Sequence, residues 1–185
     1  DSAKRLQEMG AEAYTASFYK SMMGNLSYFI DLDGNSYNAE DLSTIFLRNL
    51  KREIEEKNNV IIDGAVITIP AYFTNDQAAA TKSAGERAGF KVLKLIHEPT
   101  AAIISHGLGQ TDHDKYALIY DLGGGTFDVT VAKITPQGIN VIATIGDHNL
   151  GGKDWDAYLR DHVMREYYSI TDIDIESSHP EYMSE

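Results

Sequence analysis

Residues 120–128 run Tyr-Asp-Leu-Gly-Gly-Gly-Thr-Phe-Asp, and this stretch places three consecutive glycines between two hydrophobic runs. Such a loop is costly to order, because glycine loses more conformational freedom on folding than any other residue. Glycines are favoured where the backbone approaches a ligand closely or adopts a positive φ, and consecutive N–H groups there form a concave site for phosphate oxygens. The segment therefore predicts a phosphate-binding loop at Gly123, Gly124 and Gly125.

Two carboxylates and one hydroxyl flank these glycines. Asp121 ends the first hydrophobic run, and Thr126 and Asp128 begin the second. Carboxylates repel a phosphate unless a hard cation lies between them, and Mg²⁺ held largely through water suits that position. We therefore expect Asp121 and Asp128 to hold a metal ion and Thr126 to contact a phosphate oxygen or a metal-bound water. Taken alone, the segment also fits a plain β-hairpin with two solvated aspartates.

A second glycine turn, His-Asn-Leu-Gly-Gly at 148–152, comes directly before a predicted helix. Helix N-termini bind anions through their free N–H groups. Because Gly151 and Gly152 lie one hairpin beyond the first loop, we expect both turns to form one extended phosphate channel. The spacing of the glycines fits neither a Walker A loop nor a dinucleotide-binding fingerprint.

Hydrophobic periodicity indicates alternating helices and strands on both sides of this loop, which predicts the α/β class. We expect a hairpin over 25–37 and a helix or loop over 2–19. An amphipathic helix capped by Asn38 should follow the hairpin. Further helices are predicted at 76–88, from Pro99 to Gly107, and after Asp154. Strands are predicted at 65–69 (buried), 92–96, 116–120, 127–134 and 139–145.

Composition excludes several classes of protein. The chain has 185 residues, of which 43% are hydrophobic, and its 16 basic and 28 acidic side chains give a net charge of −12. This charge opposes nucleic acid and anionic membranes as partners, and no apolar run reaches the ~18 residues of a membrane span. The absence of cysteine excludes disulfide scaffolds, cysteine nucleophiles and thiolate metal sites. By length alone, the chain corresponds to one domain.

Four blocks, at 65–73, 88–102, 119–128 and 150–156, carry a family resemblance in their order and spacing. They resemble the nucleotide-binding domain of the 70-kilodalton heat-shock chaperones, within the actin/sugar-kinase superfamily, and the resemblance covers essentially the whole chain. It implies a partial actin-like (ribonuclease H-like) ATPase fold. Residues 1–112 would form part of lobe I, and residues 113–185 the start of lobe II with the second phosphate loop. The family's first phosphate loop, adenosine-binding helices and peptide-binding domain are expected outside this chain.

The resemblance also assigns roles within the site. Lys20 falls where the family keeps a lysine that positions the γ-phosphate and the attacking water, and Glu98 matches a glutamate near that water. The catalytic set it implies is Lys20, Glu98, Asp121 and Thr126, with Asp121 and Asp128 at the metal. The implied cofactors are ATP or ADP with Mg²⁺, and K⁺ is a further candidate. Backbone phosphate contacts are implied for Gly123, Gly124, Gly125, Gly151 and Gly152.

Three positions depart from the family pattern. Ala78 replaces a usual Arg, His97 a common Asn and Lys153 a common Glu. These changes suggest altered coupling of the nucleotide state to the interdomain linker and co-chaperone, or altered ribose contacts. They keep open a regulatory or exchange-factor-like relative that binds nucleotide without hydrolysing it. An actin-like filament protein is a third hypothesis, against which the blocks around Pro70 and Glu98 argue.

The resemblance further implies partners and a location. Expected partners are a J-domain co-chaperone, a nucleotide exchange factor and unfolded polypeptides bound through a domain outside this chain. A cytoplasmic location is expected. ATP hydrolysis is expected of the full-length protein, whereas this chain alone should be inactive, because it supplies only one of the two phosphate hairpins.

Overall fold

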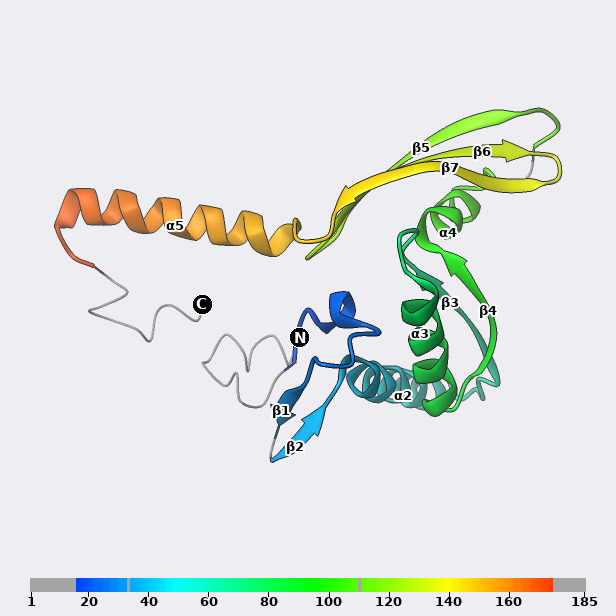
Figure 1. The fold of residues 1–185 in the computed structure, drawn as a ribbon, viewed down its shortest axis with the longest axis horizontal. Helices are drawn as coiled ribbons and strands as arrows, with labels where there is room; N and C mark the ends of the chain where they lie inside the picture. Colours follow the sequence, from blue (N-terminus) through cyan, green and yellow to red (C-terminus); the bar gives the residue numbers. More distant parts are fainter. Residues whose placement is uncertain (1–15, 33, 110, 175–185) are drawn as a thin grey trace.

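The computed structural model describes residues 16–32, 34–109 and 111–174 and confirms the α/β class (Figure 1). Residues 2–15 of the predicted opening segment, and Asp33 of the predicted hairpin turn, lie outside the described residues. The elements are, in order, η2 (Tyr19–Met22), β1 (Ile30–Leu32), β2 (Asn35–Tyr37), α2 (Ala39–Asn58), β3 (Gly64–Ile69), α3 (Asn75–Arg87), β4 (Lys91–His97), α4 (Glu98–Ser105), β5 (Lys115–Leu122), β6 (Phe127–Thr135), β7 (Gly138–Asp147) and α5 (Gly152–Thr171).

Helix α2 begins at Asn38 as predicted, because a capping box satisfies its first N–H groups. The Asn38 side chain accepts the Asp41 N–H at 2.8 Å, and the Asp41 carboxylate accepts the Asn38 N–H at 3.2 Å. Arg87 at the end of α3 binds the same turn, with 3.1 Å to Glu40 and 2.6 Å to Asp41. The Arg87 hydrogen bond lowers the pKa of Asp41. The two helices are therefore joined at this end.

Strands β3 and β4 form a parallel pair, and α3 is the crossover between them. Gly85 of α3 lets the helix lie against the pair. A Cβ there would be 2.6 Å from Ile67 Cδ1 and 2.9 Å from Val92 Cγ2. The sequence predicts a buried strand at 65–69, but only its last residue, Ile69, is buried, and Val66 is 52% exposed. The prediction of burial was wrong for the rest of β3, because no described element covers the face that carries Val66.

Strands β5, β6 and β7 form an antiparallel sheet in that order. Ala132 and Ile134 of β6 are buried with Ile103 of α4, so α4 joins this sheet to the β3–β4 pair (Figure 1). The glycine segment 123–126 connects β5 to β6, and β7 leads through residues 148–151 into α5. The sheet thereby brings both glycine turns to one end.

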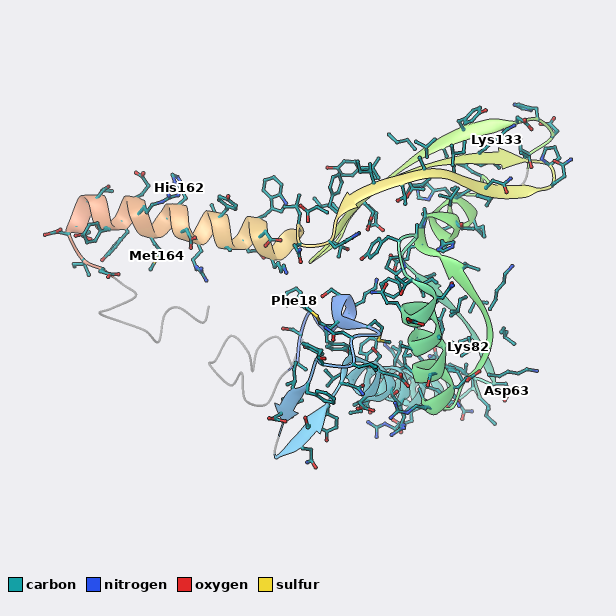
Figure 2. All side chains as sticks on the ribbon, viewed as in Figure 1. Phe18, Asp63, Lys82, Lys133, His162 and Met164 are labelled. Atoms are coloured by element: carbon teal, nitrogen blue, oxygen red, sulfur yellow. The ribbon has the colours of Figure 1, made fainter. Side chains whose placement is uncertain are left out.

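Helix α5 extends away from the other elements, and none of its residues is buried (Figure 1). Figure 2 shows His162 and Met164 projecting from it with no described element beside them. Its predicted apolar side is open as well: the Trp155 side chain is 60% exposed. On β5, Tyr120 is 67% exposed. Among the described residues, nothing covers these two apolar surfaces. None of the described helices is both long enough and apolar enough to cross a membrane.

Candidate functional site

The loop between β5 and β6 is closed by its own backbone. The Gly123 N–H donates to the Thr126 carbonyl at 2.8 Å. The next three N–H groups, of Gly124, Gly125 and Thr126, donate to no other described residue. A Cβ on Gly124 would have no heavy atom within 4 Å, so space is open there. The loop therefore has the free N–H donors and the room that a bound anion requires.

The expectation that these glycines serve a positive φ was wrong. None of Gly123, Gly124 and Gly125 lies in the left-handed region. Close packing instead requires a glycine in the second turn, at Gly151. A Cβ on Gly151 of the second turn would lie 2.6 Å from the Gly124 carbonyl oxygen and closer still to the Gly125 nitrogen. The two turns touch backbone to backbone, which only glycine permits.

The second turn donates its hydrogen bonds to the first. The Gly152 N–H donates to the Gly123 carbonyl and the Lys153 N–H to the Gly124 carbonyl, both at 2.9 Å. The Gly151 N–H donates to the Asp154 carboxylate at 2.8 Å. The two turns lie together as the sequence suggests, but the N–H groups that it assigns to phosphate at Gly151 and Gly152 are already paired. The Gly152 N–H holds the glycine loop, and the Gly151 N–H is bonded to Asp154 at the start of α5.

A cavity of about 310 Å³ opens beside the loop. It brings together residues from η2, the β3–α3 connection, the β4–α4 junction, the end of β5 and the start of α5. The lining includes all four residues of the predicted catalytic set and the three glycines of the first loop. It consists of Phe18, Lys20, Ser21, Tyr72, Glu98, Asp121, Gly123, Gly124, Gly125, Thr126 and Lys153.

Lys20 and Glu98 form an ion pair in this cavity, with 2.6 Å between Nζ and Oε1. They are 78 positions apart, and each is held by a local element. Lys20 lies in the short helix η2, and Glu98 starts α4 with Pro99 behind it, a proline position that favours the beginning of a helix. A lysine here can bind an anion, and a carboxylate here can orient a water molecule.

Asp121 and Asp128 face each other directly across the β5–β6 pair. Burial raises the pKa of Asp128, and the nearby carboxylates of Asp121 and Glu98 raise it further, while His148 and Lys20 act in the opposite direction. Like charges opposed across two strands are destabilising unless a cation lies between them. Two carboxylates with free lone pairs are hard oxygen donors, which suit Mg²⁺.

Within the described part of the chain, no group of three or more His, Cys, Asp or Glu side chains is arranged to hold a metal ion alone. Asp121 and Asp128 would therefore provide only part of a Mg²⁺ coordination sphere. Mg²⁺ commonly keeps several water ligands and takes others from phosphate oxygens. The donor set fits a cation that is held jointly by protein, water and ligand.

Comparison with known families adds a match over nearly the whole chain. The sequence model of the family described as Hsp70 protein matches residues 6–183. The chain belongs to the Hsp70 family. Its sequence is that of an Hsp70 nucleotide-binding domain, which confirms the resemblance seen in the four blocks and places the chain with the ATP-binding chaperones. Domains of this family generally bind nucleotide with Mg²⁺ and act with co-chaperones and polypeptide substrates.

Four residues of the Hsp70 cavity, Phe18, Ser21, Tyr72 and Lys153, were not among the site residues predicted from the sequence. Tyr72 stacks on His148, with 3.7 Å between the ring centroids and 35° between the planes. Burial raises the pKa of Tyr72, and the carboxylates of Asp128 and Glu98 raise it further. Phe18, with a left-handed backbone at φ 58°, contributes its ring from the residue before η2. Neither ring carries a motif signal. Lys153 was singled out in the sequence only because it replaces a glutamate that is common in the family.

The other two departures lie outside the lining of this Hsp70 cavity. His97 ends β4 directly before Glu98, and its Nδ1 lies 3.4 Å from the Pro70 carbonyl oxygen. Ala78 lies in the first turn of α3, where its N–H donates to the Thr74 carbonyl at 2.9 Å. Neither residue lines the cavity within the described chain. Their effect on coupling stays a prediction.

Proposed function

We propose that this chain forms part of the ATP-binding and ATP-hydrolysing domain of an Hsp70 chaperone, with the cavity beside the glycine loop as its phosphate site. One observation carries the proposal. Lys20, Glu98 and Asp121 come from separate segments and line one cavity together with the glycine loop. The N–H groups of Gly124, Gly125 and Thr126 in this loop have no acceptor among the described residues. Membership of the Hsp70 family supports a nucleotide as the ligand, and the geometry of the cavity supports the proposed position of its phosphates.

In this proposal, water is the nucleophile and catalysis consists of positioning and charge neutralisation. The loop N–H groups and the Lys20 ammonium hold phosphate oxygens, and Thr126 adds a hydroxyl. Glu98 and Asp121 accept hydrogen bonds from the attacking water and orient it. Mg²⁺, when bound by Asp121 and Asp128 through water, neutralises charge on the phosphates. Lys20 is kept close to that charge by its ion pair with Glu98.

The proposal includes a two-lobed domain larger than this chain, with residues 1–112 in lobe I and residues 113–185 beginning lobe II. The open apolar surfaces support it, because Tyr120 on β5 and Trp155 on α5 expose area that a folded domain normally buries. Gating of peptide binding, action with a J-domain co-chaperone and an exchange factor, and a cytoplasmic location belong to the same proposal. They rest on family membership.

The test uses the full-length protein that carries this chain. Asp121→Asn and Lys20→Ala should each lower single-turnover ATP hydrolysis at least about tenfold, because each removes a charged group from the reacting phosphates. Lys115→Ala, at the opposite end of β5, is the matched control and should leave the rate unchanged. Unchanged turnover in both site variants would refute the assignment. The chain alone should bind ATP weakly, so micromolar affinity measured by calorimetry would contradict the two-lobe proposal.

A second candidate is a relative that binds nucleotide and uses it structurally. The observation in its favour is Lys153, an additional ammonium in the cavity that can hold a phosphate but cannot act as a base while it is charged. Single-turnover kinetics separates the two candidates. Tight ATP binding without hydrolysis supports the structural role, and hydrolysis that depends on Asp121 excludes it.

A further inference from the structure

Lys153 is the charged residue of the cavity lining that the proposed mechanism does not use. It is the second residue of α5, and its N–H group is held by the Gly124 carbonyl at 2.9 Å. Its side chain runs along the loop, so that Cε lies 3.9 Å from the position a Cβ would take on Gly125. The ammonium lies over the Phe18 ring, 5.3 Å from the centroid. The side chain is thus held on the wall of the cavity.

The charges lining the cavity distinguish Lys153 from Lys20. The Lys20 ammonium is neutralised by Glu98 at 2.6 Å. Lys153 forms no ion pair with any described residue, although it lines the same cavity. Its position in the first turn of α5 is unfavourable for a cation, because the helix dipole places partial positive charge at the same end. Of the acidic groups nearby, Asp154 caps the helix through the Gly151 N–H, and neither it nor Asp121 in the cavity lining forms an ion pair with Lys153.

At this end of α5, only the Lys153 side chain is available to an anion. The first N–H groups of α5 donate hydrogen bonds to the glycine loop and to Asp154. An anion at this end of the helix would therefore contact the Lys153 side chain and not the main chain. An exposed cation–π contact with Phe18 is weaker than a charge-assisted hydrogen bond to phosphate. The ammonium can therefore exchange the ring for a phosphate oxygen at little cost.

We propose that Lys153 is a second phosphate-binding cation of this cavity and that it favours nucleotides in proportion to their phosphate charge. The proposal rests on the nucleotide site proposed above and adds specificity for the triphosphate. With Lys20 paired to Glu98, Lys153 provides the unpaired positive charge of the described cavity. It also lowers the dependence of binding on Mg²⁺, because it neutralises part of the same phosphate charge.

The experiment measures dissociation constants of ATP, ADP and AMP for the full-length protein, each with MgCl₂ and with EDTA. The variants are Lys153→Gln, which removes the charge, and Lys153→Arg, which keeps it. Lys115→Gln removes a lysine at the far end of β5 and is the matched control. Lys20→Ala reports on the nucleotide site itself. The melting temperature of each variant shows whether the fold is retained.

Lys153→Gln should weaken ATP binding about tenfold and ADP binding about threefold, the size expected for one charge-assisted hydrogen bond. The dissociation constant of AMP should change by less than about twofold. The loss of ATP affinity should be larger in EDTA than in MgCl₂. The dissociation constants of Lys153→Arg should stay within about threefold of those of the wild type, and the constants of Lys115→Gln should equal those of the wild type.

Two results would overturn the inference and leave the proposed function standing. In one, Lys20→Ala weakens ATP binding but Lys153→Gln does not. In the other, Lys153→Gln weakens all three nucleotides equally and lowers the melting temperature, which shows that Lys153 only packs on Phe18. A wild-type protein that binds no ATP would overturn the proposed function, and the inference with it.

Discussion

The two glycine turns beside the cavity are similar in sequence but opposite in their hydrogen bonding. In the loop that joins β5 and β6, three successive N–H groups, from Gly124 to Thr126, have no acceptor among the described residues. In the turn before α5, the N–H groups of Gly151 and Gly152 are donated to Asp154 and to the loop. One turn keeps its donors for a ligand, and the other uses its donors to support the first.

This difference shows that a glycine-rich turn next to a helix does not by itself provide an anion site. The second turn has the sequence of one, yet its donors are satisfied inside the protein. Its first glycine is required by contact, because the Gly151 backbone lies against Gly124 and Gly125. Substitutions in the supporting turn should therefore destabilise the fold, whereas substitutions around the open loop should affect ligand binding and leave the fold intact or more stable.

The largest effect is expected from Gly151→Ala. The added Cβ would overlap the Gly124 carbonyl group and the Gly125 nitrogen, so backbone must move. We expect a loss of about 1–3 kcal/mol of unfolding free energy, typical of overpacking, together with loss of ATP binding. Gly124→Ala is the matched control, because its Cβ meets nothing within 4 Å and should leave the melting temperature unchanged. Equal melting temperatures for both variants would contradict the supporting role of the second turn.

A smaller loss is expected from Asp154→Ala. The Asp154 carboxylate accepts the Gly151 N–H at 2.8 Å at the start of α5. Removing such a cap costs about 1 kcal/mol, which lowers the melting temperature of a domain of this size by about 2–4 °C. Asp156→Ala, two residues further along α5, is the control, and calorimetry is the measurement. If the control loses as much stability, the Asp154 hydrogen bond has no special role.

The smallest effect is a gain, expected from Asp128→Asn in the absence of Mg²⁺ and nucleotide. The pKa of Asp128 in the folded protein is raised above its ordinary value of 3.8, so ionisation of this group costs folding free energy at neutral pH. Removing one of two opposed carboxylates should restore about 0.2–1 kcal/mol, a rise in melting temperature of about 1–3 °C.

The pH dependence of this gain follows from the sign of the shift. Below pH 3.8, Asp128 is protonated in both the folded and the unfolded state, so the wild type and Asp128→Asn should melt alike. The difference in stability should develop between pH 3.8 and the raised pKa of Asp128 and then stay constant. Lys115→Gln is the control for a general charge effect. A variant that is less stable than the wild type at pH 7 would show that Asp128 supports the unliganded fold.

Much of the fold could be predicted from the sequence, because the relevant signals are local. The capping pair Asn38 and Asp41 fixes the start of α2, and Pro99 marks the start of α4. The hydrophobic runs around the three glycines predict the β5–β6 hairpin. Hydrophobic periodicity also predicts which side of α5 is apolar, but it contains no information on what covers that side. The exposure of Trp155 was therefore not predictable.

The sequence and its family resemblance bring the predicted catalytic set and the first glycine loop together, but they predict neither the contacts of the site nor its aromatic lining. Lys20 and Glu98 are far apart in sequence, and only the family resemblance indicates that they belong together. The Gly152 N–H donates to the Gly123 carbonyl because the two turns pack together. The spacing of the glycines in the sequence does not predict this packing. The same holds for Phe18, whose left-handed backbone has no sequence signal for a bulky residue.

We propose that the first glycine loop binds nucleotide phosphates and that the second glycine turn only supports it. The most direct test is a titration of ¹⁵N-glycine-labelled full-length protein with ATP and MgCl₂, followed through the amide resonances of both turns. We expect large shifts for Gly124 and Gly125, whose N–H groups have no acceptor among the described residues, and much smaller shifts for Gly151 and Gly152, whose N–H groups are already bonded. Large shifts at Gly151 and Gly152 with none at Gly124 and Gly125 would contradict this proposal.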